Sequence, residues 1–228
     1  MNQPISRAFD AAVLDPSMTR EEAVAAIKTC VEINAYSACV RPCDIEPAQD
    51  ICRGSETKVC VVLAFPHGLQ LSASKADEAK RYVDLGVDEI DMVANYGWVR
   101  SGLWDEVNAD IAAVSAVTRP AGLPLKVIFE TSQLDEPAIQ TLVEICIEAG
   151  ADFVKTSTGF NGEGAREEDA RLMLETAAGR IKVKASGGIR DLERAQMFVD
   201  MGVHRLGLNW SSAKAICAGQ KDTAAGLY

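Results

Sequence analysis

The chain has 228 residues, of which 48% are hydrophobic, and its 33 acidic and 23 basic residues give a formal net charge of −10. This length and composition allow one domain with a sizeable core, because barrels of alternating strands and helices reach this size as single units. The acidic balance argues against nucleic acid as a partner, although a local cationic pocket can still bind an anionic substrate.

The seven cysteines form no CxxC pair, which is typical of reduced thiols in an intracellular protein. No apolar run is long enough to cross a bilayer, and the first residues do not resemble a signal peptide. We therefore expect a cytoplasmic protein with no membrane partner.

Short apolar runs alternate with helical stretches along the whole chain. The expected strands are 10–14, 37–41, 58–65, 89–94, 125–130, 152–157, 182–186 and 205–209, and the clearest helices between them are 19–35, 72–86, 135–150 and 191–202. Thr19 and Glu22 form a capping-box pattern, and Gly86 and Gly150 stand where helices commonly end. Eight strands in this alternation predict a (β/α)₈ TIM barrel, a single domain over 1–228, with 220–228 as a mobile tail.

Charged residues occur in four neighbouring strands of this predicted barrel. We expect Lys126, Lys155 and Lys184 at the ends of strands five to seven, and Asp91 on strand four, where TIM barrels place their active sites. Lysine is rarely buried without a partner, so a structural ion pair is one explanation. Three inward lysines beside one acid are better explained by a catalytic site.

A lysine amine attacks a carbonyl only when it is unprotonated, and its ordinary pKa is about 10.4. A second ammonium nearby, together with burial, favours the neutral amine. Adjacent lysines are therefore suited to Schiff-base chemistry, with Asp91 as a proton-transfer group. The only two histidines, His67 and His204, show no metal-ligand spacing, and no GxGxxG motif follows a strand, so we expect no metal and no cofactor.

Glycine-rich loops follow strands six and seven, in "TSTGFNGEG" and "SGGIR". Gly187 and Gly188 could cradle a phosphate with their backbone N–H groups, or could simply form turns. Ser211 and Ser212, near the start of the last helix, favour the phosphate interpretation.

The segments "DEIDMVANYG", "LKVIFETSQL", "ADFVKTSTGF" and "VKASGGIR" resemble the signature segments of the deoxyribose-phosphate aldolase family. The resemblance spans roughly residues 8 to 207. It implies a metal-free class I aldolase that cleaves 2-deoxy-D-ribose 5-phosphate to D-glyceraldehyde 3-phosphate and acetaldehyde. It also implies that small sugar phosphates and aldehydes are the partners, and it is compatible with a homodimer.

The resemblance assigns the Schiff base to Lys155, the neighbouring amine to Lys184 and a proton relay to Asp91. The C-terminal Tyr228 matches a tail tyrosine that assists proton transfer in many members of the family. Substrate-binding residues implied by the resemblance and by the loops are Asp10, Thr156, Gly187, Gly188, Ser211 and Ser212.

Two segments depart from the family pattern. "DAAVLDP" keeps Asp10 but lacks the usual polar residues after it, and "GLNWSS" is longer than the family's Gly-x-Ser-Ser loop. These departures leave two alternatives to the aldolase: a Schiff-base enzyme of the same barrel group acting on another or unphosphorylated carbonyl compound, and a catalytically silent module that binds sugar phosphates.

Overall fold

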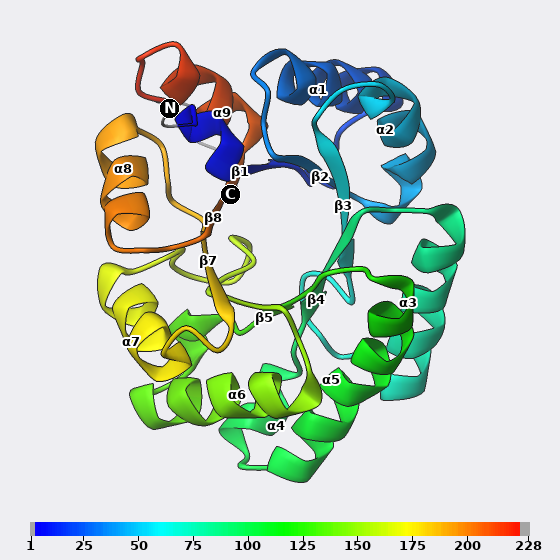
Figure 1. Ribbon diagram of the computed structural model, residues 1–228, viewed down its shortest axis with the longest axis vertical. Coiled ribbons are helices and arrows are strands. Elements are labelled where there is room, and N and C mark those ends of the chain that lie inside the picture. The colour runs from blue at the N-terminus through cyan, green and yellow to red at the C-terminus, as the bar shows by residue number, and fades with distance from the viewer. Residues whose placement is uncertain (1–2, 224–228) are drawn as a thin grey trace.

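A computed structural model describes residues 3–223 and shows one closed barrel of eight parallel strands surrounded by helices (Figure 1). The strands follow one another around the barrel in chain order, and β8 pairs with β1. The (β/α)₈ prediction is confirmed. The strands are β1 (Phe9–Val13), β2 (Ser37–Val40), β3 (Lys58–Leu63), β4 (Glu89–Val93), β5 (Leu125–Ile128), β6 (Phe153–Lys155), β7 (Lys182–Ser186) and β8 (Arg205–Asn209).

The helices form the outer layer. They are α1 (Arg20–Glu32), α2 (Ile45–Cys52), α3 (Ser72–Leu85), α4 (Tyr96–Arg100), α5 (Trp104–Thr118), α6 (Glu136–Ala149), α7 (Glu167–Ala177), α8 (Leu192–Asp200) and α9 (Trp210–Cys217). The capping box of Thr19 and Glu22 is present at the start of α1. Gly86 and Gly150 end α3 and α6 with φ of 76° and 80°, a left-handed conformation that glycine adopts without strain.

The main hydrophobic core lies between the outer faces of the strands and the helices. In β4, Ile90 and Met92 belong to this core, whereas Asp91 between them points the other way, into the barrel. The strand pleat thus separates an apolar outer layer from a polar barrel interior. Because that interior is charged, the helices supply most of the apolar surface that stabilises the sheet.

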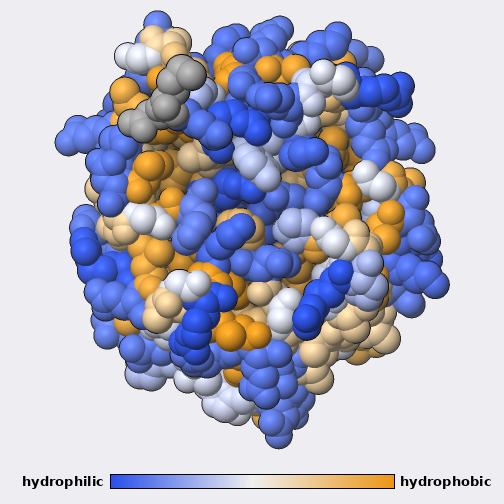
Figure 2. Space-filling view, viewed as in Figure 1, coloured by the Kyte–Doolittle hydropathy of each residue, from blue (hydrophilic) through white to orange (hydrophobic). Residues whose placement is uncertain are grey.

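The face of the molecule in Figure 2 is mainly hydrophilic, with apolar residues in small groups between the charged ones. Among residues 3–223, no helix combines the length and apolar character that crossing a membrane would need.

A buried ion pair joins two of the outer helices to the sheet. The Lys75 ammonium of α3 lies 2.5 Å from the Asp110 carboxylate of α5 and also donates to the Val93 carbonyl of β4. Both side chains are almost fully buried. This pair therefore fixes β4, the strand that carries Asp91, against the helical layer.

We predict that Lys75→Met lowers the free energy of unfolding by about 3–5 kcal/mol, because it leaves the Asp110 carboxylate buried without its counter-ion. Urea unfolding measures the change. Arg53→Met is the control, since Arg53 and its partner Asp50 are mostly exposed, and its effect stays within about 1 kcal/mol. Equal losses in the two variants would contradict the structural role of the buried pair.

Candidate active site

The barrel interior contains a continuous network of buried charges. Three carboxylates face four cations, all of them at most 7% exposed: Asp10, Glu89, Asp91, Lys126, Lys155, Lys184 and Arg205. Ion pairs connect every member of the set. Charges survive at such depth only when they are paired, so the network is one electrostatic unit.

Asp91 is the centre of the network. Its Oδ2 accepts hydrogen bonds from the Lys155 ammonium at 2.9 Å and from the Lys184 ammonium at 2.8 Å. The parallel register pairs Lys155 of β6 with Lys184 of β7, so both amines reach the same oxygen. The structure thus brings together the three residues on which the predicted Schiff-base chemistry depends.

Lys126 lies deeper in the barrel than the sequence suggested. It is the second residue of β5 and contacts Asp91 and Glu89, each at 2.7 Å, so the expectation that it ends its strand is wrong. Arg205, the first residue of β8, bonds Asp10 at 2.7 Å and Glu89 at 3.1 Å in the same layer. These groups form a charged floor beneath Lys155 and Lys184.

The neighbouring charges of the network hold Asp91 and Lys184 in their ionised forms. Burial alone would raise the pKa of the Asp91 carboxyl, but Lys126, Lys155 and Lys184 hold that pKa well below its usual range. Burial alone would lower the pKa of the Lys184 amine, but the Asp10 and Asp91 carboxylates raise it well above normal. Asp91 is therefore an acceptor at neutral pH, and Lys184 is a protonated donor.

Two predicted substrate-binding residues are engaged by the protein itself. Asp10 accepts from Ser37 and Arg205 and pairs with Lys184 at 2.6 Å, so its buried carboxylate is taken up by contacts within the protein. The Thr156 hydroxyl accepts from the Ser186 N–H at 3.0 Å and links the ends of β6 and β7.

Gly187 and Gly188 lie in the loop between β7 and α8, both with positive φ of 86° and 73°. A Cβ at Gly187 would come within 2.9 Å of the Gly164 Cα, so only glycine allows this close packing of the two glycine-rich loops. A Cβ at Gly188 would meet nothing within 4 Å. The loop therefore presents backbone next to open space, as a phosphate cradle requires.

Ser211 and Ser212 lie in the first turn of α9, and both hydroxyls donate to the Asp222 carboxylate at 2.8 Å. This contact was not foreseen from the sequence. Tyr228 lies outside the described residues, as does most of the predicted tail, so its assignment and the tail's mobility stay predictions.

Glu130 is a buried residue of the site that the sequence reasoning missed. It follows β5 with a left-handed φ of 58°, which is rare for a residue with a side chain. Its carboxylate accepts from the Thr158 N–H and hydroxyl and from the Asn161 amide, and so anchors the loop after Lys155. Burial raises the pKa of Glu130. Strained backbone at a buried acid is a signal of a functional site, but it cannot be read from the residue type.

The mouth of the barrel is apolar on the side of β1 to β3. Ala12, Leu14, Cys39, Cys60 and Val62 form a buried cluster against Phe65 and Phe160. Of the described residues, Cys39, Cys60 and Asp91 are the group that could ligate a metal ion. Because the Lys126 ammonium contacts Asp91 at 2.7 Å and Cys60 at 3.4 Å, this position already holds a positive charge that opposes a cation.

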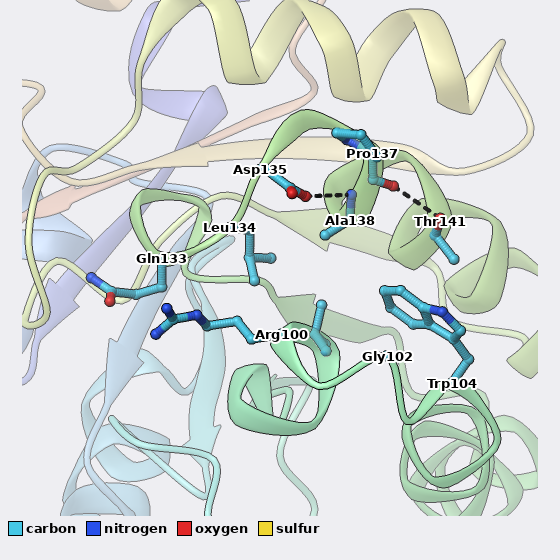
Figure 3. Close-up of a pocket in the computed structure, with 10 residues that line it drawn as sticks. Arg100, Gly102, Trp104, Gln133, Leu134, Asp135, Pro137, Ala138 and Thr141 are labelled. Carbon is cyan, nitrogen blue, oxygen red and sulfur yellow. Dashed lines mark hydrogen bonds between the residues drawn. The ribbon is translucent and has the colours of Figure 1, made fainter.

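A surface cavity of about 520 Å³ lies away from this network, between α4, α5 and α6 (Figure 3). It is lined by Arg100, Trp104 and Gln133 among others, and Asp135 caps α6 at its edge. None of the charged residues of the barrel interior lines it, so it is separate from the candidate active site.

The fold and the lysine-centred network define a TIM-barrel enzyme equipped for carbonyl chemistry. The DeoC/LacD aldolase family model matches residues 5–212. Two proteins named deoxyribose-phosphate aldolase are similar to the chain: one from Mannheimia succiniciproducens, 39% identical over 98% of both chains, and one from Staphylococcus aureus, 42% identical over 87% of this chain and 90% of that one.

Solved structures give the same result. An aldolase called QR15 superposes with a TM-score of 0.88 at 40% identity over 94% of both chains. A tetrameric deoxyribose phosphate aldolase from Aeropyrum pernix superposes with a TM-score of 0.85 at 26% identity, over 94% of this chain and 89% of that one. The chain belongs to the DeoC/LacD aldolase family.

We predict that Glu130→Ala lowers the free energy of unfolding by about 3 kcal/mol and exposes the Thr158 amide to hydrogen exchange, because buried donors lose their acceptor. Glu130→Gly is the matched variant: it removes the same carboxylate but relieves the left-handed strain, so it is more stable than Glu130→Ala by about 1 kcal/mol. Urea unfolding and amide exchange give the two readouts. Unchanged protection of Thr158 in both variants would refute the anchoring role.

The lowered pKa of Asp10 predicts a loss of stability in acid. Because the unfolded chain protonates this carboxyl at a higher pH than the folded chain, the stability it supplies is full above about pH 5 and declines as pH falls through the carboxyl range. Asp10→Asn, although less stable at pH 7, therefore shows a shallower decline between pH 5 and 3, by up to about 1.4 kcal/mol per pH unit. Unfolding by urea across this range measures both slopes, and equal slopes would contradict the prediction.

Proposed function

We propose that the protein is a class I aldolase that reversibly cleaves 2-deoxy-D-ribose 5-phosphate to D-glyceraldehyde 3-phosphate and acetaldehyde, through a Schiff base on Lys155. The observation that carries the proposal is the sharing of one Asp91 oxygen by the Lys155 and Lys184 ammonium groups. Family membership and the names of the similar proteins support the substrate.

The balance of charges in the barrel interior supports the choice of a lysine amine as the nucleophile. Counted over residues 3–223, four cations face three carboxylates, so this buried network carries one excess positive charge when every group is ionised. Lys126 pairs with three carboxylates and Lys184 with two, and both have raised pKa values. The amine proposed to lose its proton is that of Lys155, which then acts as the nucleophile beside the protonated Lys184.

The reaction then proceeds in balanced steps. The Lys155 amine adds to the C1 aldehyde of the open-chain sugar, and loss of water gives a protonated Schiff base. The C3 hydroxyl loses its proton, the C2–C3 bond breaks, and its electron pair moves into the Schiff base as an enamine of C1 and C2 while glyceraldehyde 3-phosphate, C3 to C5 of the sugar, departs. A proton added to the enamine carbon and hydrolysis release acetaldehyde and restore the amine.

The chain's own residues move the protons in this scheme. Lys184, with its raised pKa, donates protons through water, and Asp91, with its lowered pKa, holds both amines and accepts. Tyr228 is proposed to assist at the enamine carbon. The electron sink is the protonated Schiff base, so the scheme requires no metal and no organic cofactor.

Substrate binding is assigned to the rim of the barrel. Gly187, Gly188, Ser211 and Ser212 are proposed to hold the phosphate, while Thr156 and Asp10 position the groups that contact the sugar. A homodimer and a cytoplasmic location remain part of the proposal. The free state of all seven cysteines supports the location.

We predict that sodium borohydride with 2-deoxyribose 5-phosphate traps a reduced adduct on Lys155, located by peptide mass mapping, because the imine formed there is reducible. Lys155→Leu abolishes the adduct. Lys182→Leu is the matched control, since this lysine lies on β7 two residues from Lys184 but is exposed at the start of the strand; it retains full labelling.

An adduct on another lysine, or none in a folded protein, would refute the assignment. Trapping with acetaldehyde alone would then separate the alternatives: labelling of Lys155 would indicate a Schiff-base enzyme with another substrate, and no labelling would favour a silent binding module.

A further inference from the structure

The described end of the chain returns to the mouth of the barrel after α9. The Asp222 N–H donates to the Arg190 carbonyl at 2.9 Å, and the Lys221 ammonium pairs with Asp191 at 3.2 Å. These contacts dock the segment 220–223 on the loop between β7 and α8. The docking places the Asp222 carboxylate at the start of α9.

There the carboxylate takes the hydrogen bonds that an anionic ligand would take. Asp222 Oδ2 accepts from the hydroxyls of Ser211 and Ser212, each at 2.8 Å, and Ser212 is 1% exposed. Each hydroxyl has one proton to donate. The Ser211 hydroxyl also lies 3.0 Å from the Asn209 amide oxygen. This oxygen and the Asp222 carboxylate therefore compete for the single hydroxyl proton of Ser211.

The start of a helix favours negative charge, because its first N–H groups and its dipole are oriented toward it. In this chain a side-chain carboxylate already supplies that charge. A substrate phosphate arriving at the same two hydroxyls must either displace the carboxylate or lie beside it, and like charges at contact distance repel. An uncharged substrate meets no such opposition.

We propose that Asp222 is a specificity-determining residue that disfavours phosphorylated substrates at the β8–α9 end of the site and shifts selectivity toward unphosphorylated sugars and aldehydes. The proposal rests on the proposed function, since it concerns the phosphate end of the same site. It assigns a role to the segment after α9, whereas the Schiff base is formed at Lys155 in the barrel interior.

The first test compares kcat/KM for 2-deoxyribose 5-phosphate and for 2-deoxyribose in the wild type, Asp222→Asn and Asp200→Asn. Asparagine keeps the shape and an acceptor oxygen but removes the charge. The preference for the phosphorylated sugar is expected to rise about tenfold in Asp222→Asn, mainly through a lower KM. Asp200→Asn is the control. It also removes one negative charge, but Asp200 is the last residue of α8, at the other end of this helix from Asp191, which contacts the segment 220–223. This variant is expected to keep the wild-type preference.

An unchanged or reduced preference in Asp222→Asn would overturn the proposal, as would an equal rise in Asp200→Asn, which would indicate an effect of net charge alone.

The second test titrates inorganic phosphate into the three proteins by calorimetry and requires no catalysis. Asp222→Asn is expected to bind phosphate about tenfold more tightly than the wild type, and Asp200→Asn is expected to match the wild type. Equal affinity in Asp222→Asn and the wild type would overturn the role of Asp222 even in an active enzyme. If none of the three proteins cleaves either sugar, the proposed function fails. Tighter phosphate binding by Asp222→Asn than by the wild type would still support the role of the Asp222 carboxylate.

Discussion

The site depends on one buried carboxylate. Asp91 accepts from three lysine ammonium groups, and each of those lysines comes from a different strand. A buried charge is tolerable only with partners, and removal of one partner leaves the others uncompensated. The barrel interior is therefore an interdependent unit, in which the loss of one charged side chain changes the environment of all the others.

The fold imposes this arrangement through register and pleat. Parallel pairing sets Asp91 opposite Lys126 and Lys155 opposite Lys184, while alternation directs their neighbours Met92 and Val127 into the helical layer. The apolar outer layer contributes most of the favourable burial energy, so the inner layer can hold charges that contribute little to net stability. Glu130 and the Lys75–Asp110 pair then fix the loop and the strand around the network.

Local patterns predicted much of this molecule. Alternation and caps identified all eight strands and four of the helices, and the period of two placed Lys155 and Lys184 on inward faces. The depth of Lys126 was missed, because the stagger of the strands decides which residues share a layer in a closed barrel. The left-handed Glu130 was missed because residue type rarely signals such strain, and the contacts of Asp222 join segments whose proximity only the folded chain defines.

The two ends of the site have opposite electrostatic character. Inside the barrel, four described cations face three carboxylates, whereas at the start of α9 the Asp222 carboxylate accepts from the hydroxyls of Ser211 and Ser212. The net charge of −10 acts weakly here, because salt screens exposed charges beyond about 8–10 Å. A carboxylate in direct contact is screened far less. On the proposal made for Asp222, the affinity for a phosphate therefore depends on this carboxylate and the segment that carries it more than on the acidic surface.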